Sequence, residues 1–219
     1  KAKHPVSAPD GRHLVYESWS YDLDLHRLDL HGTAAPHQFG STAWEFYPTQ
    51  APDGRVAFVS NRSGTLEIWV SDAEGQAAVR VTDLNGVAPG PPRWSPDGRA
   101  LSFVAYPDGQ PEVYVVDAAT RHSRRLTTDA AYDAVPNWSH DGQWIYFASD
   151  RGGSWDVWKL PAEGGDARQV TRGGGYLAAE TADGLVFSRL DAPAAVHADR
   201  PVVRRVLLWC SGQPRPHRI

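Results

Sequence analysis

The stretch Pro92-Arg93-Trp94-Ser95-Pro96-Asp97-Gly98-Arg99 decides the fold of this chain. In the second half of this stretch, Pro96 fixes a backbone angle that suits a turn, and Asp97 can accept hydrogen bonds from the amides that follow. Gly98 tolerates a positive φ. A hairpin turn between two short strands is therefore expected. The stretch is one copy of a repeat, and the matching turn elements are centred on Asp10, Asp53, Asp97, Asp141 and Asp183.

These five aspartates are spaced by 43, 44, 44 and 42 residues. A second marker keeps the same register, because a proline stands five residues before the aspartate in the first four copies. These prolines are Pro5, Pro48, Pro92 and Pro136, and Ala178 takes the place in the fifth copy. Two markers in one register indicate a genuine structural period.

Each unit contains four short segments that are typical of β-strands. The second is an apolar run such as 56–59, the third starts with a carboxylate as in Glu67-Ile68-Trp69, and the fourth ends in a motif such as Arg80-Val81-Thr82. Since the second and third segments are apolar on both faces, each small sheet must be covered on both sides by similar sheets. The sequence therefore predicts an all-β fold, a β-propeller of about five four-stranded blades over residues 1–190.

The end of the chain departs from the repeat. The fifth unit has Glu180 where the third and fourth have Trp94 and Trp138, and residues 191–219 match no strand of the pattern. We expect an aberrant, irregular tail on an open or incomplete propeller, and the lack of any methionine indicates a fragment or a processed form. An open arc would expose two apolar blade faces, which predicts self-association into a homo-oligomer.

The repeated series Pro-x-Trp-Ser-Pro-Asp-Gly-Arg, Phe-x-Ser-Asn-Arg-x-Gly, Glu-Ile-Trp-Val and Arg-x-Thr resembles the TolB-type, WD40-like propeller repeat. The same repeat occurs in the propellers of prolyl-oligopeptidase relatives, in tricorn protease and in sensor domains of bacterial regulators. This resemblance implies a binding and gating scaffold with a protein or peptide partner. It favours the bacterial periplasm, with the cytoplasm as the alternative.

Composition excludes several classes of protein. With 41% hydrophobic and 22% charged residues, the chain has the balance of a globular protein. No apolar run is long enough for a membrane span, so no membrane insertion is expected. The 22 basic residues do not exceed the 26 acidic ones, which argues against nucleic-acid binding. The single cysteine, Cys210, excludes a disulfide framework.

The strand order predicts where a binding face lies. In an up-and-down blade, the connections between units emerge on the same face as the loops between the second and third strands. Aromatic and charged side chains on these loops would meet a polar ligand or a peptide. The residues predicted for this face are Glu45, Tyr47, Arg62, Tyr132, Asp133, Asp150 and Arg151. The alternative interpretation of Arg62 and Arg151 is that they hold blade-to-blade contacts.

A second hypothesis is a metal-dependent hydrolase of ester or phosphoester substrates. No local metal motif occurs among the nine histidines, so His4 would have to meet Glu45 and Asp133 across blades to hold zinc or manganese. A structural calcium ion is a further alternative. No Gly-x-Ser-x-Gly nucleophile motif is present, and no catalytic residue is assigned.

Other repeated residues are interpreted as architecture. The turn aspartates would cap their turns. The third-strand carboxylates Asp24, Glu67, Glu112 and Asp156 hold one position of the repeat, and Trp94 and Trp138 hold another, which favours packing between blades over ligand binding.

Overall fold

The computed structural model describes residues 2–7, 11–19, 23–32, 35, 37–39 and 41–189, with the backbone alone at 2–4, 13–14 and 17–19. Over these residues the fold is all-β: four antiparallel sheets of four strands and one of two strands, with no helix. The first sheet consists of β1 (Ala2–Ser7), β2 (His13–Trp19), β3 (Leu23–Asp29) and β4 (His37–Gln38). The second consists of β5 (Glu45–Gln50), β6 (Val56–Ser60), β7 (Glu67–Ser71) and β8 (Val79–Arg80).

The third sheet consists of β9 (Arg93–Trp94), β10 (Ala100–Ala105), β11 (Glu112–Asp117) and β12 (Ser123–Arg125). The fourth consists of β13 (Asp133–Trp138), β14 (Trp144–Ser149), β15 (Asp156–Pro161) and β16 (Arg168–Gln169). The last described strands, β17 (Ala178–Thr181) and β18 (Gly184–Phe187), form a hairpin. We call these sheets blades one to five.

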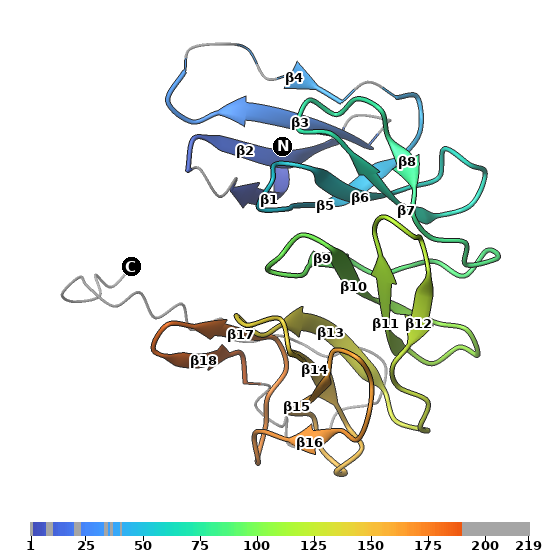
Figure 1. Cartoon of the computed structure of the whole chain (residues 1–219), viewed down its shortest axis with the longest axis vertical. Helices are drawn as coiled ribbons and strands as arrows, with labels where there is room; N and C mark the ends of the chain where they lie inside the picture. Colours follow the sequence, from blue (N-terminus) through green and yellow to red (C-terminus); the bar gives the residue numbers. More distant parts are fainter. Residues whose placement is uncertain are drawn as a thin grey trace.

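The blades follow one another around an open arc (Figure 1). The first strand of each blade contacts the first strand of the next, from β1 through β5, β9 and β13 to β17. The fourth strands β4, β8, β12 and β16 lie on the outer side of the arc. No closed ring forms among the described residues, so the prediction of an open or incomplete propeller is confirmed.

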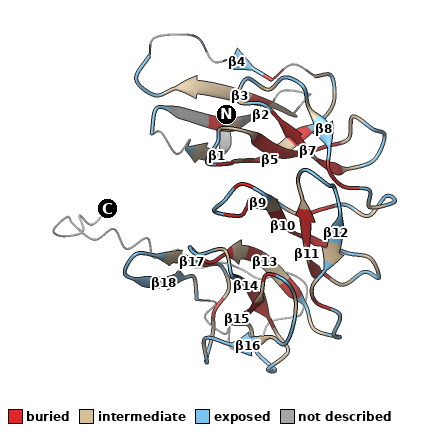
Figure 2. Cartoon of the chain, in the orientation of Figure 1, coloured by how far each residue is buried: buried red, intermediate tan, exposed pale blue. Residues whose placement is uncertain are grey.

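The core consists of the second and third strands and of the seams between blades (Figure 2). All five residues of β6 are buried, and Phe58, Phe103 and Phe147 occupy one repeat position with at most 1% exposure. Clusters of buried side chains join neighbouring blades, as where Val59 and Ile68 of blade two pack in one cluster with Phe103 of blade three. Each blade is therefore stabilised by the next, as expected for stacked repeats.

The Pro-Asp-Gly elements form the predicted hairpin turns. Ser95 and Ala100 close the turn of blade three through a backbone hydrogen bond of 2.8 Å, and Gly98 has a φ of +69° that favours glycine. Asp97 Oδ1 accepts from the amide of Arg99 at 3.0 Å and from the Ser95 hydroxyl at 2.6 Å. These hydrogen bonds lower the pKa of Asp97, with the Ser95 bond as the largest cause. The interpretation of this aspartate as a turn cap is confirmed.

Replacing Asp97 by alanine is expected to lower the free energy of unfolding by about 1 kcal/mol at neutral pH, because the turn loses the acceptor of two hydrogen bonds. The pKa of Asp97 is lowered in the folded state, so this contribution is present above the ordinary carboxyl pKa and disappears as the pH falls through the folded value. Urea unfolding at pH 7 and pH 3 measures both effects. Asp108→Ala is the matched control, since that side chain is 82% exposed; an equal loss in both variants would contradict the turn-cap role.

The third-strand carboxylates bind the end of the fourth strand. Glu67 accepts from the Thr82 hydroxyl at 2.6 Å, and Thr82 Oγ1 in turn accepts from the amide of Ile68 at 2.8 Å. Glu112 and Thr127 repeat the arrangement in blade three. This confirms a structural role, and it corrects one boundary: β8 ends at Arg80 because Thr82 turns inward toward the carboxylate.

Two repeated tryptophans connect consecutive blades. The indole N–H of Trp94 donates to the Thr49 carbonyl at 3.3 Å, and that of Trp138 donates to the Arg93 carbonyl at 2.9 Å. In each case the acceptor belongs to the first strand of the preceding blade. Glu180, at the same position of blade five, accepts from the His140 amide of blade four. The predicted packing role of these tryptophans is confirmed.

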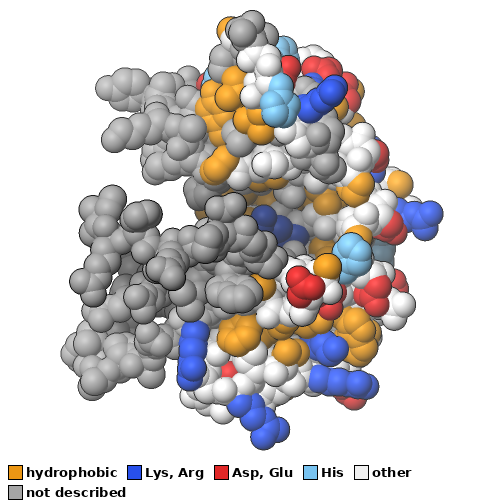
Figure 3. All heavy atoms as spheres, turned by 90° about the vertical axis from the view of Figure 1, so that its left-hand side faces the viewer, with side chains coloured by type: hydrophobic (Ala, Val, Ile, Leu, Met, Phe, Trp, Pro, Cys, Tyr) orange, Lys and Arg blue, Asp and Glu red, His pale blue; other side chains and the backbone are white. Residues whose placement is uncertain are grey.

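Blade five has two strands in the described part of the chain, and the predicted tail at 191–219 lies outside the described residues. Figure 3 shows this side of the molecule, where hydrophobic, basic and acidic side chains are intermixed on the described surface. Self-association through open blade faces stays a prediction, because a single chain does not test it.

Candidate binding face

The predicted face is built from the loops before each first strand and after each second strand. The amide of Trp44, before β5, donates to Asn61 Oδ1 after β6 at 2.9 Å. The amide of Tyr132, before β13, donates to Asp150 Oδ1 after β14 at 2.9 Å. These equivalent bonds bring the two kinds of loop together on one face in blades two and four. In these two blades, the connection between units and the loop after the second strand emerge on the same face, as the strand order predicts.

In blade two, Glu45 and Arg62 form an ion pair beneath this face. The Glu45 side chain is fully buried at the start of β5, whereas Arg62 is 22% exposed. The Arg62 guanidinium carbon lies 5.0 Å from the ring centres of both Phe58 and Trp69. Arg62 thus lies over two neighbouring aromatic rings of the blade while it pairs with the buried carboxylate.

Blade four repeats this arrangement. Arg151 donates to Asp133 Oδ2 at 2.6 Å, and its guanidinium carbon lies 5.1 Å from the ring centre of Phe147 and 5.2 Å from that of Trp158. The Asp133 side chain is fully buried, and Arg151 is 18% exposed. Asp129 adds a second carboxylate at 2.8 Å from Arg151. We call the two arrangements the arginine clamps of blades two and four.

The clamps correct the alternative interpretation of Arg62 and Arg151. Among the described residues, the partners of Arg62 belong to blade two, and those of Arg151 belong to blade four and the loop that leads into it. Within this part of the chain, neither arginine bridges two blades. Their role is to fix the first strand of a blade against the end of its own second strand.

Burial shifts the acidity of the clamp carboxyls. Desolvation raises the pKa of Glu45 and of Asp133, and the neighbouring arginine only partly offsets this effect. The second oxygen of each carboxylate, Glu45 Oε2 and Asp133 Oδ1, is buried without a hydrogen-bond partner among the described residues. The ion pairs therefore oppose the desolvation that favours the neutral form of these two carboxyls.

Each clamp is followed by a bulge in the first strand. Tyr47 and Val135 hold the same repeat position and have φ values of +57° and +47°. The pairing register shifts at this point in both β5 and β13. A positive φ is rare for a β-branched residue such as Val135, so the backbone is constrained here by its surroundings. Tyr47 is half-buried and packs edge-on against Phe46, 5.0 Å between ring centres.

Exposed aromatic side chains lie on the same face. Trp44 is 52% exposed and Tyr132 is 45% exposed, and each directly precedes a clamp carboxylate. Tyr106, after the second strand of blade three, is 49% exposed. Tyr132 is one of the residues predicted for this face, and the strand order places Trp44 and Tyr106 on the same loops.

Blade three lacks the clamp. The positions of the carboxylate, the serine and the arginine are taken by Pro89, Ala105 and Pro107. Its outer arginine, Arg125, instead pairs with Glu112 at 2.7 Å. Tyr106 therefore stands on a loop without an arginine clamp, in the blade between the two clamped ones.

The predicted metal site gains no support from the described residues. Glu45 and Asp133 lie in different blades, and each is paired with an arginine. No group of three or more His, Cys, Asp or Glu residues in the described part of the chain could hold a metal ion. The side chain of His4 lies outside the described residues. The hydrolase hypothesis stays a prediction without a site.

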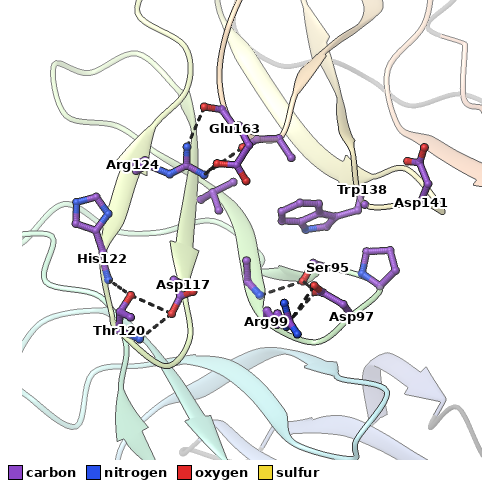
Figure 4. Close-up of a pocket in the computed structure, with 15 residues that line it drawn as sticks. Ser95, Asp97, Arg99, Asp117, Thr120, His122, Arg124, Trp138, Asp141 and Glu163 are labelled. Atoms are coloured by element: carbon purple, nitrogen blue, oxygen red, sulfur yellow. Dashed lines mark hydrogen bonds and ion pairs between the residues drawn. The ribbon is translucent and has the colours of Figure 1, made fainter.

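A groove of about 580 Å³ lies on the opposite face, between the turns of blades three and four (Figure 4). On one wall, Arg124 donates to the Glu163 carbonyl at 2.9 Å and pairs with the Glu163 carboxylate at 3.1 Å. On the other wall, Asp97 caps its turn, and Trp138 points its ring into the groove. These polar groups connect two blades and close turns. We therefore interpret the groove as the structural junction between blades three and four.

Four-stranded antiparallel sheets that follow one another around an arc, with loops gathered on two faces, define a β-propeller. The chain belongs to the TolB beta propeller domain family, whose model matches residues 15–189. The predicted resemblance is confirmed. No helix in the described residues is long and apolar enough to span a membrane.

Curated relatives match over short segments. The Tol-Pal system protein TolB of Bordetella pertussis is 40% identical over 67 residues, which are 30% of this chain and 15% of that protein. The protein TolB homolog of Chlorobium chlorochromatii is 33% identical over 95 residues, 42% of this chain and 21% of that protein. These segments span about a fifth or less of the relatives.

Solved structures match more broadly. A protein assigned as TolB from Agrobacterium tumefaciens has a TM-score of 0.75 and 25% identity, covering 90% of this chain and 73% of that one. TolB from Acinetobacter baumannii has a TM-score of 0.67 and 23% identity, covering 84% and 47%. An oligogalacturonate lyase in complex with manganese has a TM-score of 0.60 and 20% identity, covering 78% and 53%. The last two likenesses show the fold alone.

Proposed function

We propose that the chain is a protein-binding propeller scaffold whose binding face carries Trp44, Tyr106 and Tyr132. The observation that supports this best is the repeated pairing of an exposed aromatic residue with a buried arginine clamp. Tryptophan and tyrosine supply much of the energy of protein interfaces, because they bury large area at low entropy cost. The clamps hold the loops that carry them, which reduces the cost of ordering on binding.

Membership of the TolB family supports a protein partner, since the matched relative from Bordetella pertussis is named as a protein of the Tol-Pal system. We therefore propose another protein of that system as the partner class. The family resemblance also supports a periplasmic location. The face offers few features of a small-molecule site, because its aromatic side chains stand on loops and the clamp carboxylates are buried.

The double variant Trp44→Ala/Tyr132→Ala is expected to weaken binding at least tenfold, since loss of two interface aromatics exceeds about 1.4 kcal/mol. Biolayer interferometry on the immobilised full chain, with the purified Tol-Pal proteins of Bordetella pertussis as analytes, measures the effect. Val79→Ala on β8 is the control, because Val79 is 42% exposed on the outer side of the arc. Unchanged affinity in the double variant, with circular dichroism showing an intact fold, would contradict the proposal.

A further inference from the structure

The outer edge of the fifth blade is open in the described part of the chain. There β18 pairs only with β17, whereas the second strand of every other blade lies between two strands (Figure 1). The Ser188 amide donates to the Leu177 carbonyl, toward β17. Since successive residues of a strand face opposite sides, Leu185, Phe187 and Arg189 direct their backbone groups away from β17. No backbone hydrogen bond within the described residues uses these groups.

Apolar side chains are uncovered along this edge. Phe187 holds the repeat position of Phe103 and Phe147, which are fully buried, yet it is 37% exposed. Its neighbour Val186 is also 37% exposed. Figure 2 shows the contrast between the pale β18 and the buried strands β10 and β14. Covering β18 would thus add hydrophobic burial to backbone pairing.

The other blades show which residues face this edge. In blades two, three and four, the last residue of the second strand pairs with the carboxylate that opens the third strand. These pairs are Ser60 with Glu67, Ala105 with Glu112 and Ser149 with Asp156. Glu180 pairs with Leu185 as Trp138 pairs with Ile145, so blades five and four can be aligned. In this alignment Arg189 takes the position of Ser149, the last residue of the second strand of blade four. The Arg189 guanidinium is therefore where it would face the carboxylate that opens a third strand.

Arg189 is exposed and has no ion-pair partner among the residues that the structure describes. Two positions further back, the phenylalanine of blades two, three and four pairs with an aromatic residue of the third strand. These pairs are Phe58 with Trp69, Phe103 with Tyr114 and Phe147 with Trp158. The residue between the carboxylate and the aromatic is Ile68, Val113 or Val157.

We propose that the outer edge of β18 binds an extended segment of another polypeptide by antiparallel strand addition. The segment has the order carboxylate, aliphatic, aromatic, so that its carboxylate meets Arg189 and its aromatic ring covers Phe187. Backbone hydrogen bonds supply affinity and the two side-chain pairs supply specificity. This site is separate from the face that carries Trp44 and Tyr132, so either proposal can fail without the other.

The test uses the full chain and a fluorescent peptide with residues 109–118 of this sequence, GQPEVYVVDA, which is a third strand of the repeat. Fluorescence anisotropy is expected to show micromolar binding. Arg189→Glu should weaken it at least tenfold. A peptide with the Glu112→Lys change should bind the original chain poorly and bind the Arg189→Glu chain well. Hydrogen exchange should show new protection of the Leu185 and Phe187 amides only when the peptide is present.

Several outcomes would overturn the proposal. Absence of binding, or binding that Arg189→Glu leaves unchanged, contradicts the edge site. Protection of the Leu185 and Phe187 amides without peptide would show that the chain's own residues beyond 189 occupy the edge. Protection that grows with chain concentration would assign the edge to a second copy of the chain, which also contradicts a free extended segment as the occupant.

Discussion

Arg151→Ala is expected to lower the free energy of unfolding by about 3 kcal/mol at pH 8. The substitution leaves the fully buried Asp133 carboxylate without its main cation, and breaking a buried ion pair costs about 3 to 5 kcal/mol. The lower end applies because the guanidinium is 18% exposed and part of its charge is screened by solvent. The variant also loses the contacts of Arg151 with Phe147 and Trp158. Urea unfolding followed by tryptophan fluorescence measures the loss.

The pH dependence of this variant has a defined sign. Burial already raises the pKa of Asp133, and removal of Arg151 raises it further. The folded state then binds a proton more tightly than the unfolded state, so the free energy of unfolding rises as the pH falls through the folded pKa toward that of an unfolded aspartate. Asp133→Asn in the same variant should recover much of the loss at pH 8. Arg99→Ala is the control, since its side chain is 84% exposed; a loss below 0.5 kcal/mol for both arginines would contradict the clamp.

Phe147→Ala is expected to cost about 3 to 5 kcal/mol, because the ring is fully buried at the centre of blade four and supports the Arg151 guanidinium. Chemical unfolding measures the change. The repeat supplies a matched control in Phe187, which occupies the same position of blade five with 37% exposure. Phe187→Ala should cost less than about 1 kcal/mol. Equal costs would show that blade five is as fully covered as blade four, against the open edge of β18.

The fold could be predicted from the repeat because each turn and strand has a local signature. Asp97 and Gly98 favour a hairpin turn between two strands. The regular spacing of the repeated aspartates then shows where the strands on either side of each turn lie. The end of β8 could not be predicted, since it depends on the side-chain hydroxyl of Thr82 reaching Glu67 across the blade. Strand ends set by such tertiary contacts are invisible to local patterns.

The sequence pattern did not reveal the chemistry of the predicted face residues. The alternation of strand direction predicts that Glu45, Arg62, Asp133 and Arg151 lie on one face, and the structure joins them as two ion pairs within single blades. Their use as buried clamps depends on how far each side chain is covered by rings of its own blade, and spacing carries no such information. Sequence position puts Trp44 on this face, but only the structure shows that it is 52% exposed while the packing tryptophans Trp94 and Trp138 are buried.

The most direct test of the proposed function is to map, by hydrogen exchange, the part of the full chain that a purified Tol-Pal protein of Bordetella pertussis protects. The proposal predicts protection of the loops 42–46, 61–65, 106–110 and 129–133, with the turns of the opposite face unchanged. Protection confined to 95–99, 117–124 and 141–143, around the groove between blades three and four, would contradict it and would assign binding to that groove.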